Sequence, residues 1–540
     1  MALIQKAFSD IITFSRTSNA TRIGPTGLVE YAPHNLLLYS QEFDNAAWTK
    51  GANVTVTANA AAAPDGTVTA DLVVSSASAD SSTNQVFQQV TVASSQTYTT
   101  SFWVRTAGAN QNITVRQTAN GVLVTNTTVA VTSTWQRVSV TFTASTNPGF
   151  AIRPDTVSNL NIYIWGAQLA VGPYALDYTP TTSAAVYGPR FDFDPVTLAP
   201  KGLLVEEQRT NLLTYSEQFD NAAWVKSGTT VTANAAAAPN GTVTADLVTA
   251  NTSSSFGFLY SNNIASGVFT TSVYAKQGTQ RYIQFLSTAT TAYWANFDLQ
   301  DGLAYAGGTT SSVSIVSVGN GWYRCSLSVT DSNSNQPTIG FVTSLNSARA
   351  PSTTLTTNCY LWGAQLEAGS FATSYIPTIA STVTRSADVA SVNTLSPWFN
   401  ATEGTLFAEY NNPYPVAADQ YVAVLQDASY VANAISIRNY TTAIINQVWA
   451  GSVRQVDIVD GTASANATSK TTFAYQLNNS AASSNGGTAV VDTTCTMPTG
   501  ILTLNIGNRN GNSEFKNGYI RRIAYYPRRL TNAELQALTS

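Results

Sequence analysis

Charged side chains are scarce in this sequence. Asp, Glu, Lys and Arg make up 10% of its 540 residues, against about 25% in a typical soluble domain. Thr, Ser, Asn and Ala stand in their place. Long helices in water usually carry many charged residues, whereas Thr, Val, Tyr and Trp suit a pleated sheet. The shortage of charge therefore predicts a β protein.

Histidine and basic clusters are equally rare, and this excludes several classes of function. The 26 basic and 30 acidic residues give a net charge of −4 without any basic block, so we expect no nucleic-acid partner. His34 is the single histidine and follows Pro33, which predicts a turn residue rather than a catalytic base. No zinc-protease, serine-hydrolase or phosphate-loop motif occurs. We expect no cofactor and no metal.

Three cysteines, Cys325, Cys359 and Cys495, lie far apart in no zinc spacing. We expect them to be small buried apolar residues, although a bridge between Cys325 and Cys359 stays open. The first residues lack the basic and apolar regions of a signal peptide, and no apolar run is long enough to span a bilayer. The sequence thus predicts synthesis in a cytoplasm, no secretion and no membrane insertion.

An internal duplication is the strongest pattern that is present. LLLYSQEFDNAAW (36–48) returns as LLTYSEQFDNAAW (212–224), and VTANAAAAPDGTVTADLV (56–73) returns at 231–248 with one change, Asp65 to Asn240. Both copies also end alike, at 162–181 and 359–378. Self-similarity of this kind indicates two homologous modules.

Each copy consists of short alternating or apolar runs bounded by Gly, Asn, Asp and Ser, which is typical of a β-sandwich or jelly roll. We predict an all-β chain of tandem modules. A T-x-x-E capping box at Thr531 and Glu534 predicts a helix near the end. The expected organisation is an N-terminal segment, a first module, a linker, a second module, a second linker and an unlike β domain, at 1–35, 36–188, 189–211, 212–383, 384–399 and 400–540.

Several of these motifs resemble known proteins. FSRTSNATRIGPTGLVE (14–30), the stretch 189–224 and the WGAQLE ending of the second copy are similar to modules of phage and prophage virion proteins, namely head spike fibres and carbohydrate-binding-module-like tail proteins. The resemblance covers about residues 1–390. The segments Glu403–Phe407, Leu504–Gly507 and 517–538 resemble a laminin-G/concanavalin-like jelly roll.

The resemblance implies a structural or adhesive protein of the virion surface that attaches to host polysaccharide. Head spike, capsid decoration and tail fibre share these modules, and the lack of a long shaft or heptad run favours the head. Phage spikes of this type imply a homotrimer. We expect residues 1–35 to hold the chain to other virion proteins and residues 400–540 to face the ligand, unless that domain only caps the stack.

Glycan binding would use aromatic rings for stacking and Asn or Arg for hydroxyl groups. Trp165 and Trp362, inside apolar strands, are expected in the core. Trp48 and Trp224, which follow polar FDNAA, are candidate stacking residues. The Asn/Gly tract 508–517 is a loop that could hold a sugar or a calcium ion, although it has few carboxylates for calcium. The remaining candidate glycan-binding residues are Asn508, Asn510, Asn512 and Arg521.

Glycoside hydrolysis requires only two carboxylates, and the sequence contains several acidic pairs. Asp192 and Asp194 precede a proline in a junction, where Asp commonly stabilises turns. Glu206 and Glu207 would point to opposite faces of an extended run. Asp71 and Asp246 occupy matching places in the two modules, which indicates a structural role. We therefore expect no enzyme, and a polysaccharide depolymerase remains the alternative.

Overall fold

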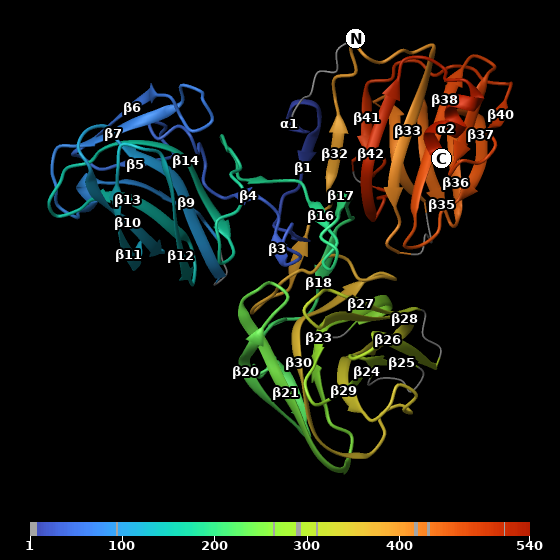
Figure 1. Cartoon of the computed structure of the whole chain (residues 1–540), viewed down its shortest axis with the longest axis horizontal. Helices are drawn as coiled ribbons and strands as arrows, with labels where there is room; N and C mark the ends of the chain where they lie inside the picture. The colour runs from blue at the N-terminus through green and yellow to red at the C-terminus, as the bar shows by residue number, and fades with distance from the viewer. Residues whose placement is uncertain are drawn as a thin grey trace. The chain divides into compact units, whose positions relative to one another are not determined.

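The structure is a computed structural model that describes residues 8–92, 96–262, 265–287, 293–308, 312–414, 419–428, 432–511 and 513–540. Antiparallel β-sheets form nearly all of it, which confirms the expected all-β fold of tandem sandwiches. The chain divides into two compact units, residues 30–188 and residues 1–29 with 189–540. Figure 1 shows the first sandwich in blue to teal, the second in green to yellow and the third in orange to red.

The first sandwich, in unit 30–188, packs two five-stranded sheets face to face. In order across the first sheet lie β11 (Val122–Val131), β10 (Gln111–Ala119), β13 (Pro148–Pro154), β8 (Val86–Gln89) and β5 (Thr49–Lys50). Across the second lie β12 (Gln136–Ala144), β9 (Gln96–Thr106), β14 (Asn161–Val171), β7 (Ala70–Ser75) and β6 (Val54–Ala61). The inward faces bury Val104, Ile113, Phe150 and Ile162.

The second sandwich repeats this strand order with additional strands at one edge. One sheet runs β19 (Trp224–Ser227), β22 (Phe258–Ser261), β29 (Pro337–Val342), β24 (Tyr282–Ser287), β25 (Tyr293–Asp298) and β26 (Leu303–Gly308). The other runs β20 (Thr229–Ala237), β21 (Val243–Ser255), β30 (Thr353–Ala368), β23 (Ala265–Gln277), β28 (Trp322–Asn335) and β27 (Ser312–Ser317). The duplication read from the sequence is thus a duplication of topology.

Matching side chains make matching contacts in the two copies. Trp48 Nε1 donates to the Tyr39 carbonyl at 3.0 Å, as Trp224 Nε1 does to the Tyr215 carbonyl. The carboxylate of Asp71 accepts from two backbone N–H groups, those of Phe43 and Asn59, and Asp246 accepts from Phe219 and Asn234. These two acids fix the bend between paired strands, which agrees with the structural role expected for both.

The third sandwich consists of two seven-stranded sheets, and its strands come from the N-terminal segment, from both expected linkers and from the C-terminal region. Its first sheet runs β1 (Thr13–Ser15), β32 (Val389–Val392), β41 (Thr503–Ile506), β34 (Gln420–Gln426), β35 (Ala434–Tyr440), β36 (Ala443–Ala450) and β37 (Val453–Thr462). The second runs β16 (Phe191–Phe193), β17 (Pro200–Val205), β42 (Gly518–Tyr526), β33 (Glu403–Asn411), β38 (Thr468–Gln476), β39 (Ser480–Ser484) and β40 (Val490–Asp492).

This arrangement differs from the expected domain boundaries. The expected linkers 189–211 and 384–399 and part of the segment 1–35 supply strands β16, β17, β32 and β1 to the third sandwich. The physical reason is apolar burial, because Leu203, Val205 and Ala390 are 5% exposed or less and lie in its core. Sequence 400–540 alone is therefore an incomplete sandwich.

Short segments complete the fold. The strand pairs β2 (Thr21–Ile23) with β3 (Val29–Tyr31), β4 (His34–Asn35) with β15 (Val186–Tyr187), and β18 (Arg209–Asn211) with β31 (Val383–Arg385) form small ladders. A short helix, α1, spans Phe8–Ile11. Helix α2 (Asn532–Thr539) begins at the expected capping box, with Thr531 accepting from the Glu534 backbone. Among the described residues, no helix has the length and apolar character needed to cross a membrane.

His34 and the cysteines have structural surroundings. His34 is 1% exposed, its Nε2 accepts from the Val171 backbone at 2.8 Å, and its Nδ1 lies 2.8 Å from the Ala32 carbonyl. It therefore bridges two backbone segments in β4, instead of occupying an exposed turn. Cys325, Cys359 and Cys495 are all buried free thiols, so the possible bridge is not formed.

Candidate functional site

The two tryptophans proposed for stacking on a sugar lie in the cores. Trp48 is 1% exposed and packs on Phe43 with ring centroids 4.6 Å apart, and Trp224 is 2% exposed and packs on Phe219 at 4.8 Å. Rings buried on both sides present no face to a ligand. Their positions do not support the proposed role, because the polar FDNAA segment folds as a cap over an apolar ring.

The C-terminal candidates do not form one site either. Asn508 is fully buried, with its Nδ2 donating to the Ile506 carbonyl at 3.0 Å and its Oδ1 accepting from Gly511 at 2.7 Å. Asn510 holds a turn at φ 56°, and Asn512 lies outside the described residues. Arg521 is exposed and faces Glu409 at 3.6 Å. Asn508 therefore stabilises its own loop from the inside and does not present its amide to a sugar.

An open face of the first sandwich offers better chemistry. We use the term open face for the outward surface of the sheet β5–β8–β13–β10–β11. Strand register places one cross-strand row on it, because residues directly opposite each other point to the same side. From β11 to β5 this row reads Asn126, Arg116, Ala151, Phe87 and Thr49.

Arg116 is the distinctive residue of the open face. Its guanidinium is partly exposed and has no hydrogen-bond, ion-pair or ring partner among the described residues. Asn126, next to it on β11, is exposed and its side chain is equally unengaged. Partial burial and the neighbouring Arg153 lower the pKa of Arg116, although an arginine stays protonated at neutral pH. The row therefore presents a cation and an amide to solvent.

Small buried residues separate the partly exposed side chains of the open face. Ala151 is fully buried between Arg116 and Phe87, and the Phe87 ring lies over Gly149 so closely that a Cβ there would meet it at 2.8 Å. Thr118 Oγ1, in the next row, is buried without a hydrogen-bond partner. Phe87 and Arg116 are both partly exposed, so this face offers an aromatic ring and a cation to a polar ligand with an apolar face.

The second sandwich covers part of the corresponding face with its own chain. Lys226 stands where Lys50 stands, so the residues equivalent to the row of Arg116 are Trp294, Leu286, Thr338 and Tyr260. The next row on the same face contains Asn296 and Gln284. Gln284 binds its own chain at 344–350, donating to the Ala348 carbonyl at 3.0 Å and accepting from the Ala350 backbone at 2.7 Å. Asn296 donates to the carbonyls of Leu345 and Ser347, both at 2.8 Å.

The covering segment has no counterpart in the first sandwich. Residues 343–352 connect β29 to β30, whereas the shorter run 155–160 connects β13 to β14. In addition, the Phe256 ring lies directly on Gly340. In the second copy this segment covers the row of Gln284, and Leu286, which stands at the place of Arg116, is 6% exposed. In the first copy Arg116 is partly exposed.

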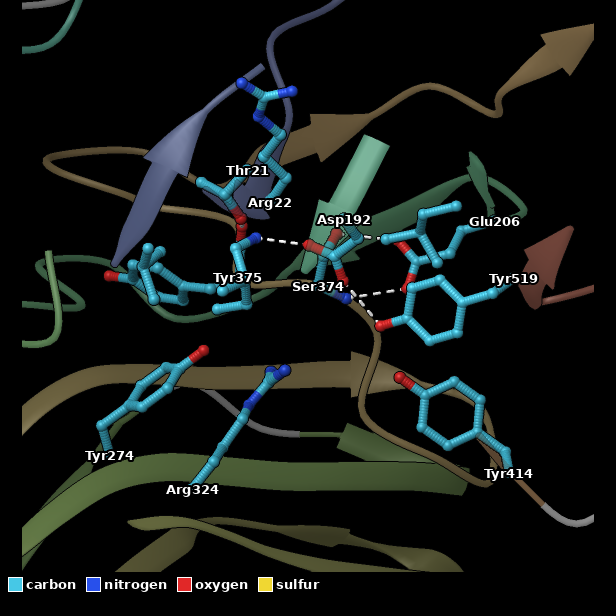
Figure 2. A pocket seen from close by; sticks show the side chains of 13 residues that line it. Thr21, Arg22, Asp192, Glu206, Tyr274, Arg324, Ser374, Tyr375, Tyr414 and Tyr519 are labelled. Carbon is cyan, nitrogen blue, oxygen red and sulfur yellow. Dashed lines mark hydrogen bonds between the residues drawn. The ribbon is translucent and has the colours of Figure 1, made fainter. Parts of the chain in front are cut away.

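A pocket in unit 1–29 with 189–540 brings together two of the acids considered for catalysis. In Figure 2, Tyr274, Arg324 and Tyr414 project toward a cavity that Asp192 and Glu206 line from the other side. The cavity measures about 90 Å³, less than the roughly 150 Å³ of a cavity that holds benzene. A sugar ring does not fit there.

Both acids of the pocket are already engaged. Asp192 accepts from Tyr519 at 2.7 Å and from the Ile23 backbone, and burial raises its pKa. Glu206 accepts from the Ser374 backbone and hydroxyl and from Arg190. Burial alone would raise its pKa, but Arg385 and Arg190 lower it to about 2. Neither carboxylate is free to reach a substrate, so the pair is structural.

Glu206 belongs to a buried cluster of five ionisable residues, which we call the arginine cluster. Arg16 donates to Asp388 at 2.8 Å, and Arg190 bridges Glu206, at 2.7 Å, and Asp388. Arg385 lies 3.4 Å from Glu206. The side chains of all five are 1% exposed or less. The cluster joins the N-terminal segment and both expected linkers into one unit.

Sequence reasoning missed Arg116, Phe87 and Asn126, because it relied on the ends where the copies agree. These residues lie in the divergent middle of the module. The signal was the divergence itself, since a residue that changes between two copies of one fold is not required by that fold.

Comparison with known proteins supports a carbohydrate-related fold for the first sandwich. Residues 35–166 match the family model of a carbohydrate binding domain, and they include the whole open-face row. None of the curated proteins compared matches the chain.

Three solved structures are similar to parts of the chain. A tandem CBM22 domain of Paenibacillus barcinonensis Xyn10C has 13% identity, a TM-score of 0.22 and coverage of 63% of this chain and 98% of that one. The LG4-5 domains of mouse laminin alpha1 have 10% identity, a TM-score of 0.20 and coverage of 52% and 90%. A sialidase CBM40 of Ruminococcus gnavus has 12% identity, a TM-score of 0.22 and coverage of 26% and 84%. These scores are low, and no inference rests on them.

Proposed function

We propose that this chain is a non-enzymatic glycan-binding protein of a bacteriophage surface, a head spike or capsid decoration, and that the open face of its first sandwich is the binding site. The observation that carries the proposal is the row Asn126–Arg116–Ala151–Phe87, in which a guanidinium and an aromatic ring are both partly exposed on the outward face of the sheet. The carbohydrate binding domain match over residues 35–166 supports glycan as the ligand.

The virion part of the proposal rests on the resemblance of residues 1–390 to head spike and tail modules. The alternative is a tail fibre, in which the same protein is located on the tail of the particle instead of the head. A homotrimer and contacts with other virion proteins remain part of it, with one revision. The described part of segment 1–35 up to residue 29 already packs into its own unit, so an anchor would be a folded surface rather than a free segment.

The site is tested with the full-length chain. Affinity electrophoresis through gels containing neutral and acidic polysaccharides should show retardation by at least one polymer. Arg116→Ala and Phe87→Ala should each weaken retardation about tenfold, since each removes one contact of roughly 1.4 kcal/mol. The matched control is Arg105→Ala, which removes the same charge from β9 on the opposite sheet.

Two outcomes would contradict the proposal. One is that no polysaccharide of the panel, including extracted host capsule, retards the wild-type chain. The other is that Arg105→Ala weakens binding as much as Arg116→Ala. The seat on the particle is tested separately by immunogold electron microscopy, and antibody label confined to a bacterial cell fraction would refute the virion assignment.

A further inference from the structure

The outward surface of the other sheet of the first sandwich, β12–β9–β14–β7–β6, carries a cluster of aromatic rings. Trp103, Trp165 and Tyr178 contact one another with ring centroids 4.9 to 5.4 Å apart, and Trp135 packs beside them. Trp165 is 5% exposed, whereas the other three rings are partly exposed. We use the term aromatic face for these four rings together with the adjoining loop 63–67.

The second sandwich contains the same cluster. The residues that correspond to Trp103, Trp135, Trp165 and Tyr178 are, in this order, Tyr274, Trp322, Trp362 and Tyr375. All four are 3% exposed or less. The first copy has not exchanged its rings for polar side chains, since a tryptophan stands in the place of Tyr274. Partly exposed rings that cluster in this way are typical of an interaction surface.

A hairpin from the N-terminal segment buries the rings of the second sandwich. It comprises β2, a turn at residues 24–27 and the beginning of β3. Val29 packs among the rings and is 5% exposed. Leu28 lies over Gly241, where a Cβ would meet it at 2.9 Å. We call residues 21–29 the N-terminal hairpin.

Two hydrogen bonds fix the N-terminal hairpin on the second sandwich. The Val29 backbone donates to the Pro239 carbonyl at 3.0 Å, and Thr21 Oγ1 donates to the Tyr375 carbonyl at 2.5 Å. Both acceptors are main-chain carbonyls next to the rings. The surface therefore combines apolar contact with acceptors for a backbone N–H and a hydroxyl, and a backbone N–H is a donor that a polypeptide supplies.

The first sandwich has the same features without an occupant. Gly66 corresponds to Gly241 in the repeated stretch, and a Cβ on Gly66 would meet nothing within 4 Å. The carbonyls of Pro64 and Tyr178 correspond to the two acceptors, and no donor among the described residues reaches either of them. Pro64 is exposed, whereas Pro239 is buried. The aromatic face thus has space for a leucine and two free acceptors.

A second copy of this chain does not supply the missing hairpin. Residues 21–29 of each copy already lie on that copy's own second sandwich. The other hairpin that precedes a module, β16–β17, is joined to the third sandwich because β17 pairs with β42. The occupant therefore comes from a different chain.

From these observations we propose that the aromatic face is a docking surface for a β-hairpin of another protein. The partner hairpin has the chemistry of the N-terminal hairpin, a glycine turn followed by two apolar residues. The first of these residues fits over Gly66, and the second donates its backbone N–H to the Pro64 carbonyl while its side chain enters the ring cluster. This inference goes beyond glycan binding and does not depend on it.

The probe for the test is a peptide of residues 18–31 of this chain, cyclised head to tail so that its turn is preformed, and labelled with a fluorophore. Fluorescence anisotropy measures its binding to the full-length protein, where we expect one peptide per chain. Leu28→Asp in the peptide should weaken binding about tenfold, because the apolar contact of the leucine with the loop is lost.

Substitutions in the protein test the aromatic face itself. Gly66→Asn fills the space for the leucine, and asparagine tolerates the positive φ of this position. Trp103→Glu places a charge among the rings. Each should weaken peptide binding about tenfold, whereas Trp103→Tyr, which installs the ring of the second sandwich, should keep it. The matched control is Val124→Glu, because Val124 is 41% exposed on the opposite sheet.

Hydrogen exchange locates the bound peptide. Exchange should slow in residues 61–69 and stay unchanged in residues 236–244. Slowing confined to 236–244 would overturn the proposal, because the peptide then replaces the chain's own hairpin. Absence of peptide binding, or equal weakening by Val124→Glu, also overturns it. If Gly66→Asn instead abolishes retardation by polysaccharide, the ligand of the aromatic face is a sugar, and the proposal of a protein partner fails.

Discussion

Lys516 is a buried lysine whose described contacts include no carboxylate. It is fully buried, its Nζ donates to Asn412 and lies 3.5 Å from Gln420, and it sits 5.2 Å from the Tyr410 ring centroid. Burial lowers its pKa to about 7. Amide oxygens satisfy an ammonium only in part, so the folded third sandwich favours the neutral amine.

The pKa of Lys516 predicts a pH-dependent stability. An unfolded lysine titrates near 10.4, so between about pH 7 and pH 10 the unfolded chain binds a proton that the folded chain does not. Stability must then rise with pH across this window, by up to about 1.4 kcal/mol per pH unit. In Lys516→Met the rise should be absent. Urea unfolding at pH 7, 8 and 9 measures the free energy of unfolding. An equal pH dependence in the wild type and in Lys516→Met would contradict the prediction.

At the scale of elements, the repeats were predictable and the junctions were not. Near-identical ends such as Trp48 and Trp224 revealed the two modules, and Thr531 with Glu534 revealed the final helix. The segments around Arg190 and Arg385 look like linkers because they are short and rich in Pro, Ser and Gly. Their partners lie far along the chain, and no local pattern encodes such pairing. The open face was missed for the same reason, since it depends on strand register.

The covering segment 344–350 is expected to depend on Gln284. Gln284→Ala removes both of its hydrogen bonds to this segment, so Arg349 should become accessible to trypsin. Limited proteolysis with mass spectrometry should show a new cut after Arg349 in the variant. Asn126→Ala, a change on the open face of the first sandwich, should leave the rate of that cut unchanged. Equal cutting of Gln284→Ala and the wild type would show that the segment is held by other contacts.

Neighbouring glutamates provide a matched test of the arginine cluster. Glu206→Gln leaves Arg190 and Arg385 without one carboxylate, and breaking a buried pair costs about 3–5 kcal/mol. Glu207→Gln removes an ion pair with Arg209 at the surface, where the Glu207 side chain is 35% exposed. Its loss should lower the free energy of unfolding by less than about 1 kcal/mol. Scanning calorimetry should show a lowered transition for unit 1–29 with 189–540 in the first variant alone. Equal shifts in both variants would contradict the prediction.

At the scale of the whole molecule, the two units differ in how their chain is used. Residues 30–188 are one continuous stretch with a complete core. The other unit is assembled from residues before and after that stretch, and the second and third sandwiches share it. The first sandwich is thus an insertion between β2 and β16 of the other unit, although it is half of a sequence duplication.

This organisation predicts opposite results for two truncations. Residues 30–188 expressed alone should fold and keep the binding of the full chain, which circular dichroism and calorimetry would measure. Deletion of 400–540 should leave β32 without its neighbour β41 and β17 without its neighbour β42, and should yield an aggregating product. A soluble truncated chain with a cooperative transition for residues 189–399 would show that these strands are dispensable.

The distance along the chain between Arg16 and Asp388, 372 residues, also sets an order of events during synthesis. Ribosomes add about 5–20 residues per second, so β1 must wait roughly 20 to 75 seconds for β32. The first sandwich has all of its strands long before that and can fold while the rest is being made. The N-terminal segment meanwhile remains an unpaired strand carrying an uncompensated arginine. Nascent chains stalled before residue 388 should therefore be the most vulnerable to chaperone capture and proteolysis at their N-terminus, although that end is synthesised first.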